Sequence, residues 1–317
     1  MENITKNYTL SLRAIITVII TSLVYVVLMA ILVGLKPEHL FIVGIFNICF
    51  FLGSQTRRFI LAFSIFIVYG VVYDLMRIYP NYLVNAVDIQ GLFTLEKSLF
   101  GIHSGNAILT PNQYLELHHN SFLDVVAGLF YINWVPIPLA FAFYLYFKNK
   151  RQFLYFSLAF FMANIIGFCI YYIHPAAPPW YVAEYGFELH QNTPGSTAGL
   201  ARFDALINLP VFSSIYSKNS NVFAAMPSLH CAYPVIVFYY GLRNKLGKIN
   251  WFFGLFMAGI WFSAVYSGHH YIMDVIMGIL CGLTAILILH YCLLRTKGFS
   301  RFLNKYEDTI STKQNIS

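Results

Sequence analysis

Charged residues are scarce in this sequence: Asp, Glu, Lys and Arg make up 10% of its 317 residues, whereas hydrophobic residues make up 58%. A chain with so little charge and a mean hydropathy of +0.64 cannot cover a globular surface with polar groups, which excludes a water-soluble domain. The formal net charge is +7, but the basic residues are scattered between apolar runs, so nucleic acid is not an expected partner. The composition indicates a polytopic membrane protein whose basic residues face anionic lipid.

Cysteines are also few, and they lack the spacing of a metal site. The 5 of them lie in or beside apolar runs, at Cys49, Cys169, Cys231, Cys281 and Cys292. We therefore expect packed thiols, with no disulfide framework and no zinc site. Internal repeats and low-complexity tracts are absent as well, so we expect a single transmembrane domain over residues 1–317.

Long apolar runs, in contrast, are abundant. A membrane-spanning helix needs about 20 mostly apolar residues, and the runs predict about eight spans, of which the second is short. They cover residues 12–35, 39–54, 59–78, 121–147, 152–173, 227–243, 250–267 and 270–295. The expected fold class is therefore all-α, a polytopic integral membrane protein.

Lys and Arg fall mostly on one side of this arrangement. Basic loops stay in the cytoplasm, which predicts that both termini are cytoplasmic. All His residues except His290 then fall on the exoplasmic side, where we expect the chemistry. The long connections on that side, residues 79–120 and 174–226, are predicted to hold short interfacial helices. Few basic residues remain there: Lys36, Arg77, Lys97, Arg202 and Lys218.

Two short motifs place ionisable residues at the mouths of apolar runs on that face. Residues 226–230 read Met-Pro-Ser-Leu-His, and residues 267–274 read Ser-Gly-His-His-Tyr-Ile-Met-Asp. Ionisable groups at membrane depth are costly, so several of them facing one site indicate function. His270 and Asp274 are four residues apart, which on a helix puts both on one face. If Asp274 accepts the Nδ1 proton of His270, Nε2 becomes a nucleophile that can form a phosphohistidine intermediate.

His230 completes this candidate catalytic set. Ser228 is the expected N-cap of the helix that carries His230, and the free N–H groups of a helix N-terminus can hold a phosphate. His230 can protonate a departing alkoxide and then deprotonate an incoming hydroxyl. The scheme requires no metal and no cofactor. A structural polar network between helices and a helix-borne metal site remain alternative interpretations.

The two motifs together resemble the type 2 phosphatidic acid phosphatase superfamily. Its second motif reads Pro-Ser-Gly-His, and its third reads Ser-Arg, five residues, His, three residues, Asp. Here Leu229 replaces the glycine, and Ser263-Ala264 stands in place of Ser-Arg. The superfamily's first motif, Lys, six residues, Arg-Pro, is absent at residues 174–181. The phosphate-binding arginine of the third motif is therefore missing.

With these departures, the sequence resembles a narrower group of the superfamily, the inositol phosphorylceramide synthases inhibited by aureobasidin. The similarity covers roughly residues 90–295 and is carried by Ala-Pro-Pro-Trp-Tyr at 177–181, Gly-Leu-Ala-Arg-Phe-Asp at 199–204, Pro-Ser-Leu-His at 227–230 and His-His-Tyr-x-x-Asp at 269–274. It implies a catalytic core of about six helices (59–295), with two extra N-terminal helices (12–54) and a cytoplasmic tail (296–317). It also implies that phosphoinositol moves from a phosphatidylinositol-type donor to the primary hydroxyl of a ceramide-type acceptor, which releases diacylglycerol. His270 would then be the nucleophile, Asp274 its orienting partner and His230 the acid and base.

A cation must still offset the charge of the pentavalent transition state. Arg202 is the first candidate, followed by Lys97 and His269. The remaining substrate-binding candidates are Ser228, His118, His119, Asp124, Trp180 and Tyr181. Structural alternatives stay open for most of them: a capping role for His269, a loop-stabilising His–Asp pair at 118–124, an Arg202–Asp204 ion pair, and interfacial belt positions for Trp180 and Tyr181.

Rival functions also stay open. A lipid phosphatase of the same superfamily would use water as the acceptor, and a related transferase would move phosphocholine or phosphoethanolamine to ceramide. A non-enzymatic transporter would use the histidines as proton relays, but transporters carry their polar groups near the middle of the bilayer, whereas these lie at helix ends. The short terminal segments favour a bacterial inner membrane.

Overall fold

The computed structural model describes residues 10–217 and 221–311, and most of them are helical. The all-α fold class is confirmed, since the only sheet in those ranges is a hairpin of β1 (Ile102–Ser104) and β2 (Ala107–Leu109). The chain divides into two compact units, one of residues up to Ile78 with those from Phe302 onwards, the other Tyr79–Arg301. The single transmembrane domain stays a prediction, and so does its division into two extra helices (12–54), a catalytic core (59–295) and a tail (296–317). Lys218 and residues 312–317 of the predicted tail lie outside the described residues.

The first unit is a set of apolar helices with a polar cluster at one end. Asp74 accepts a hydrogen bond from Arg77 Nε at 2.7 Å and pairs with His39 Nε2 at 2.9 Å. Tyr306 donates to the Leu61 carbonyl at 2.6 Å. The elements are α1 (Leu12–Leu32), α2 (Pro37–Leu52), α3 (Ser54–Leu75), η1 (Met76–Ile78) and the larger part of α15 (Lys297–Ile310).

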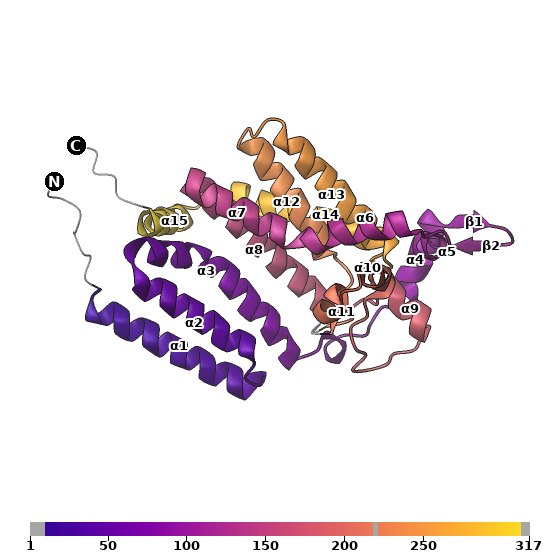
Figure 1. Cartoon of the computed structure of the whole chain (residues 1–317), viewed down its shortest axis with the longest axis horizontal. Coiled ribbons are helices and arrows are strands. Elements are labelled where there is room, and N and C mark those ends of the chain that lie inside the picture. Colours follow the sequence, from indigo (N-terminus) through magenta and orange to yellow (C-terminus); the bar gives the residue numbers. More distant parts are fainter. Residues whose placement is uncertain (1–9, 218–220, 312–317) are drawn as a thin grey trace. The chain divides into compact units, whose positions relative to one another are not determined.

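The second unit carries both sequence motifs (Figure 1). Short helices fill its two long connections, as predicted: η2 (Asn81–Leu83), α4 (Gln90–Phe100) and α5 (Pro111–Leu117) in one, and α9 (Pro179–Tyr185), η4 (Ala198–Leu200), α10 (Ala201–Ile207) and α11 (Val211–Tyr216) in the other. The longer elements are α6 (Ser121–Tyr131), η3 (Ile132–Trp134), α7 (Pro136–Lys148), α8 (Lys150–Ile173), α12 (Leu229–Arg243), α13 (Ile249–Tyr266) and α14 (Ile272–Leu287), which continues through the π-helical turn η5 (Ile288–Cys292) into η6 (Leu293–Arg295).

In the described part of the chain, 5 helices are long and apolar enough to cross a membrane, which makes this an integral membrane protein. They are α1, α3 with η1, α8, α13, and α14 with η5 and η6. A sixth span arises if α6 and α7 count as one, in which case the span predicted over 121–147 is bent by 44° at their junction. Pro136 at the start of α7 has no N–H to donate, and its ring disfavours a helical preceding residue. Since α2 and α12 have only 16 and 15 residues, the count of about eight spans stays a prediction.

Helix α12 forms the centre of the second unit, where it contacts α8, α13 and α14. Two glycines on α14 allow its close approach. A Cβ on Gly278 would lie 2.2 Å from the Ser228 carbonyl oxygen, and one on Gly282 would lie 2.9 Å from that of Ala232. The N-termini of α12 and α14 therefore lie together, and with them the two motifs.

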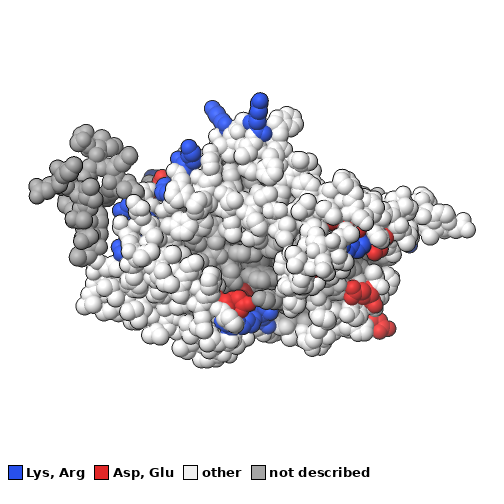
Figure 2. All heavy atoms as spheres, in the orientation of Figure 1, with Lys and Arg blue, Asp and Glu red and all other residues white. Residues whose placement is uncertain are grey.

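The surface of this unit matches a membrane environment. Figure 2 shows basic side chains where α12 joins α13, a region that contains Arg243 at the end of α12 and Lys245 and Lys248 in the loop, and few charges along the helices. Apolar side chains are exposed on α13, including Leu255 at 62%. Hydrocarbon is the environment in which such a surface is stable.

Candidate active site

His270 lies in a turn rather than on a helix. The turn joins α13 to α14 and is sharpened by Gly268, whose φ of 72° favours glycine. Because α14 begins at Ile272, the expectation that His270 and Asp274 share a helical face is wrong. They are nevertheless close, with His270 Nδ1 3.5 Å from Asp274 Oδ2, because Asp274 folds back to accept the N–H of Tyr271 at 2.8 Å.

The tautomer of His270 is set chiefly by a backbone carbonyl. Its Nδ1 lies 3.0 Å from the oxygen of Ala225, which can only accept, so Nδ1 carries the proton and Nε2 keeps its lone pair. Backbone pairing holds Ala225 in place, since its N–H donates to the Ala176 carbonyl at 3.3 Å, and the N–H of Ala176 donates to Phe223 at 3.0 Å. Asp274, to which the sequence assigned this hydrogen bond, is the more distant partner.

His230 faces His270 across the junction of the two motifs. Its Nδ1 lies 3.3 Å from His270 Nε2, and the Ser228 N–H donates to the Asp274 carbonyl at 3.0 Å. Ser228 occupies the N-cap position of α12 as expected, but its side chain makes no capping hydrogen bond. Rings surround His230 on the other side, with centroid distances of 4.4 Å to Trp134 and 5.1 Å to Tyr131. The structure thus brings His230, His270 and Asp274 into one site.

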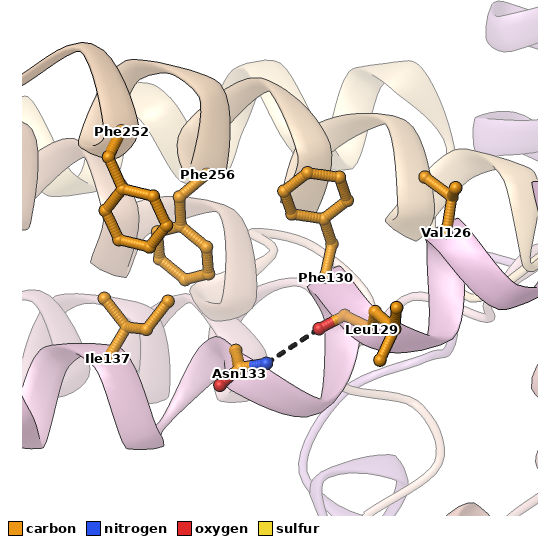
Figure 3. A pocket seen from close by; sticks show the side chains of 7 residues that line it. All are labelled: Val126, Leu129, Phe130, Asn133, Ile137, Phe252 and Phe256. Atoms are coloured by element: carbon orange, nitrogen blue, oxygen red, sulfur yellow. Dashed lines mark hydrogen bonds between the residues drawn. The ribbon is translucent and has the colours of Figure 1, made fainter.

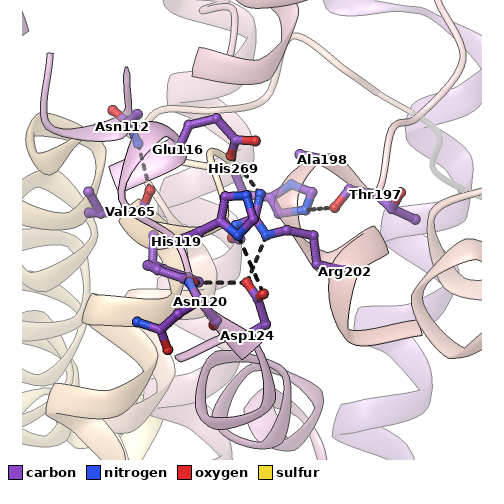
Figure 4. A network of polar contacts seen from close by, with 12 residues as sticks. Asn112, Glu116, His119, Asn120, Asp124, Thr197, Ala198, Arg202, Val265 and His269 are labelled. Atoms are coloured by element: carbon purple, nitrogen blue, oxygen red, sulfur yellow. Dashed lines mark hydrogen bonds and ion pairs between the residues drawn. The ribbon is translucent and has the colours of Figure 1, made fainter. Parts of the chain in front are cut away.

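Arg202 lies in a second polar cluster, shown in Figure 4. Its Nε donates to Asp124 Oδ1 at 2.7 Å and its Nη1 to Glu116 Oε2 at 2.6 Å, and the side chain of His119 lies 3.7 Å from Asp124. Burial disfavours the charged guanidinium, yet the bonds to Asp124 and Glu116 raise the pKa of Arg202. Tyr266 also donates to Asp124 Oδ1 at 2.8 Å. Arg202 is therefore charged, but the two carboxylates outweigh its charge.

The alternative ion pair between Arg202 and Asp204 is wrong. Asp204 instead accepts the N–H groups of Phe212 and Ser213 at 3.0 and 2.9 Å, so it fixes the start of α11. A carboxylate at a helix start is favoured by the free N–H groups there.

His269 is buried and uncharged. It lies beside His270 in the turn that precedes α14. Its ring stacks between Tyr131 and Tyr216, with centroids 5.7 and 4.4 Å away, and its Nε2 lies 3.0 Å from the Thr197 carbonyl. Burial lowers the pKa of His269 to about 3, and the electrostatic interaction with the neighbouring His270 acts in the same direction. A neutral ring cannot supply the cation that the transition state needs.

Lys97 and His118 lie at the edge of this region. Lys97 is half-buried on α4, with its Nζ 5.8 Å from the ring centroid of Phe93. His118 is exposed at the end of α5, where it stacks on Tyr114 at 4.0 Å and bonds that residue's carbonyl through Nδ1 at 2.7 Å. These contacts are local and leave both side chains accessible.

Trp180 and Tyr181 are buried on α9, at 7% and 0% exposure, so the interpretation of them as interfacial belt residues is wrong. The backbone N–H of Trp180 donates to the Gly268 carbonyl at 3.0 Å, which ties α9 to the turn that carries His270. Tyr181 donates to the Glu188 carbonyl at 2.8 Å and packs against Phe223. Both residues support the walls of the site.

Two residues at the site were missed by sequence reasoning. Glu96 is 0% exposed and accepts the N–H groups of Ile272 and Met273 at 2.9 and 3.1 Å. Asn112 donates through Nδ2 to the carbonyls of Val265 and His270 at 2.8 and 2.9 Å. Glu96 falls within the region of family similarity at residues 90–295, but nothing local in the sequence indicates that either side chain reaches the turn.

An apolar groove opens beside the site (Figure 3). It has a volume of about 440 Å³ and lies between α13 and the α6–η3–α7 segment, and its lining residues are Val126, Leu129, Phe130, Asn133, Ile137, Phe252 and Phe256. The amide of Asn133 is satisfied by the Leu129 carbonyl at 2.8 Å, so the lining is mainly hydrocarbon. Phe130 and Asn133 each adjoin a residue, Tyr131 or Trp134, whose ring contacts His230.

No cluster of three or more His, Cys, Asp or Glu side chains within residues 10–217 and 221–311 is arranged to hold a metal ion. The 5 cysteines are free thiols, of which Cys231 and Cys281 are buried.

Comparisons with known proteins agree with these motifs. The PAP2 superfamily matches residues 104–288. The chain is 47% identical over 296 residues to a phosphoinositol dihydroceramide synthase of Bacteroides thetaiotaomicron, an alignment that covers 92% of this chain and 96% of that protein. It is also similar to an inositol phosphorylceramide synthase of Candida albicans, at 28% identity over 75% of this chain, and to the catalytic subunit of such a synthase in Saccharomyces cerevisiae, at 29% over 61%. These alignments span 50% and 47% of the two fungal proteins, so the chain matches about half of their length. No solved structure matches significantly.

Proposed function

We propose that this chain, which belongs to the PAP2 superfamily and is an enzyme of the inositol phosphorylceramide synthase type, transfers phosphoinositol from a phosphatidylinositol-type donor to a ceramide-type acceptor. The observation that carries the proposal is the facing pair of imidazoles, His230 Nδ1 and His270 Nε2, 3.3 Å apart at the N-termini of α12 and α14. Because the bacterial relative is named for dihydroceramide, we propose a dihydroceramide as the acceptor.

The first half-reaction would form a phosphohistidine. His270 Nε2 attacks the phosphorus of the donor diester, and the bond from phosphorus to the diacylglycerol oxygen breaks. His230 enters this step as the imidazolium, gives its proton to that oxygen and becomes neutral, so diacylglycerol leaves as the neutral alcohol. The positive charge that develops on His270 is stabilised by the Ala225 carbonyl at 3.0 Å and by Asp274 at 3.5 Å.

The second half-reaction reverses these roles. The primary hydroxyl of the acceptor loses its proton to His230 as its oxygen attacks phosphorus, and the bond from phosphorus to His270 Nε2 breaks. One diester replaces another, and both histidines return to their starting protonation states. The scheme requires no metal and no cofactor.

The cluster around Arg202 is suited to a polyol headgroup. Two carboxylates and one guanidinium carry a net negative charge, so we assign Arg202, Asp124 and Glu116 to the hydroxyls of inositol rather than to its phosphate. His119, whose side chain is 42% exposed beside Asp124, would contribute to the same subsite, as would the accessible His118. The phosphate itself would lie at the N-terminus of α12, behind Ser228.

The groove of Figure 3 is suited to one hydrocarbon tail of a lipid substrate. Its apolar lining matches an acyl chain, and the rings of Tyr131 and Trp134 connect it to His230. We propose that the tail lies in this groove while its headgroup is held at the two motifs.

The membrane orientation also remains part of the proposal. The basic loop between α12 and α13 supports a cytoplasmic position for that end, which would put both motifs and the active site on the exoplasmic face and both termini inside. The bacterial relative supports a bacterial inner membrane.

Mass spectrometry of lipids tests this function directly. Purified protein is incubated with dihydroceramide and a panel of donors carrying inositol, choline or ethanolamine, and free phosphate is assayed in parallel. We expect inositol phosphorylceramide and diacylglycerol in equal amounts from the inositol donor alone. His270→Ala should abolish turnover, while His103→Ala, at an exposed residue of β1, should retain it. Release of phosphate or inositol phosphate without a ceramide product would instead identify a phosphatase.

A further inference from the structure

The turn that carries His270 is held from outside both motifs. Glu96, on α4, reaches the first turn of α14 and accepts the N–H of Ile272 at 2.9 Å through Oε1 and that of Met273 at 3.1 Å through Oε2. Its side chain is completely buried, so water cannot take over either hydrogen bond. Both oxygens accept, which favours the ionised carboxylate, because the hydroxyl oxygen of a protonated one is the poorer acceptor.

Asn112 holds the same turn on its other side. Its Nδ2 donates to the carbonyl of Val265 at 2.8 Å and to that of His270 at 2.9 Å, and the residue is 6% exposed. One amide group thus joins the last turn of α13 to the backbone of the proposed nucleophile itself. Removing it would leave two carbonyls buried without these partners.

Two buried carboxylates at the N-terminus of α14 cost more free energy than is needed to satisfy the N–H groups of a helix start. A Ser or Thr at the N-cap usually satisfies the free N–H groups of a helix at no cost in charge. Here Asp274 bonds the N–H of Tyr271, and Glu96 bonds the next two, so two carboxylates lie close together in a buried site. Their repulsion adds to the effect of burial, which raises the pKa of the Glu96 carboxyl. The N-terminal dipole of α14 offsets part of that cost.

We propose that Glu96 and Asn112 are positioning residues that fix His270 for attack on phosphorus, an inference that rests on the proposed phosphotransferase function. Glu96 sets where α14 begins and Asn112 sets where α13 ends, so together they define the path of the turn between Val265 and Met273. The imidazole of His270 contacts Ala225, Asp274 and His230, and these side-chain contacts require the turn to be in place first. A nucleophile displaced by about 1 Å loses on the order of 100-fold in rate.

Substitutions of equal size test this proposal in the full-length, membrane-embedded enzyme. Glu96→Gln replaces one acceptor by a donor that faces an N–H group, and Asn112→Asp replaces both donations by repulsion between oxygens. We expect each to lower kcat per folded molecule by about 10- to 100-fold, with KM for both lipids within about twofold of wild type. The double variant should lose less than the product of the two single losses, because both residues act on one turn. Matched controls are Glu188→Gln, at an exposed carboxylate, and Asn244→Asp, whose amide bonds the Tyr240 carbonyl at the opposite end of α12.

Hydrogen exchange at residues 265–275 gives a readout that does not depend on activity. We expect faster exchange at the amides of Ile272 and Met273 in Glu96→Gln, with the rest of α14 protected as in wild type. Faster exchange together with a lower kcat supports the proposal. Unchanged exchange, unchanged kcat, or an effect on KM alone would overturn it. Loss of all folded protein in both variants and in Asn112→Ala would also overturn it, because the two residues would then determine the fold rather than position His270. If wild type lacks phosphoinositol transfer, the proposed function fails, while the exchange data still decide whether the two residues hold the turn.

Discussion

Gly278→Ala tests whether the close approach of α12 and α14 creates the active site. The Cβ of an alanine at this position would lie 2.2 Å from the Ser228 carbonyl oxygen, and protein Cβ atoms essentially never come closer than 3.0 Å to such a neighbour. The clash is with backbone, so no side chain can turn aside. The two helices must separate by about 0.8 Å, from 2.2 Å to at least 3.0 Å.

This separation acts at the point where the motifs meet. Ser228 lies two residues before His230, and its N–H bonds the Asp274 carbonyl one turn from Gly278. Overpacking of this kind costs about 1–3 kcal/mol of stability. Because the gap between His230 and His270 widens by a large fraction of 1 Å, we expect kcat to fall on the order of 10- to 100-fold.

The assay is ceramide-dependent turnover per folded molecule, measured together with thermal stability. Gly254→Ala on α13 is the matched control, since its new Cβ would meet only Phe238 at an ordinary 3.6 Å and alanine favours a helix. Gly282→Ala, where the clash is a milder 2.9 Å and one turn farther along, should lie between the two. Wild-type kcat in Gly278→Ala would refute the argument that helix contact sets the distance between the histidines.

Other regions of the site give further expectations. Arg202→Lys should raise KM for the inositol donor about tenfold with a smaller change in kcat, because an ammonium group cannot keep the forked hydrogen bonds to two carboxylates. Steady-state kinetics at varied donor concentration measure this change, and an unchanged KM would contradict the prediction. Burial lowers the pKa of His269 in the folded state to about 3, whereas its ordinary value is near 6.5. As the pH falls below 6.5, the unfolded state therefore binds a proton that the folded state does not. The free energy of unfolding then decreases by up to about 1.4 kcal/mol per pH unit. Melting temperatures between pH 4 and 8 should therefore depend more steeply on pH in wild type than in His269→Phe, and equal slopes would exclude a buried neutral ring. Leu129→Trp places a larger side chain in the groove, at a residue that is 54% exposed, and should lower turnover of long-chain substrates about tenfold relative to short-chain ones. The control Phe143→Trp, at a residue of α7 that is 50% exposed and lies outside the groove, should leave this ratio unchanged.

The sequence was sufficient for the parts of this account that depend on composition and on short motifs. Apolar runs of about 20 residues predicted the membrane helices, because hydrocarbon thickness sets a minimum length. His230, His270 and Asp274 were identifiable because ionisable groups at helix ends in an apolar chain are rare. The break at Pro136 was also visible in the sequence, and a strict use of proline's missing N–H would have divided the predicted span at that residue.

The supporting contacts could not be predicted, because they join residues far apart in the chain. Glu96 bonds a residue 176 positions away, and Asn112 one 158 positions away. The partners of Arg202 lie 78 and 86 positions from it, whereas sequence reasoning offered its near neighbour Asp204. The carbonyl of Ala225, which sets the tautomer of His270, is a backbone group that every residue type provides.

Trapping of the covalent intermediate tests the central claim most directly. Purified enzyme is mixed with phosphatidylinositol in the absence of ceramide, quenched at alkaline pH to preserve phosphohistidine, digested and analysed by mass spectrometry. We expect the mass of phosphoinositol on the peptide that contains His270, its disappearance when ceramide is added before the quench, and its absence in His270→Ala. Turnover to inositol phosphorylceramide with no adduct at any time point, or with the adduct on a different residue, would contradict the account.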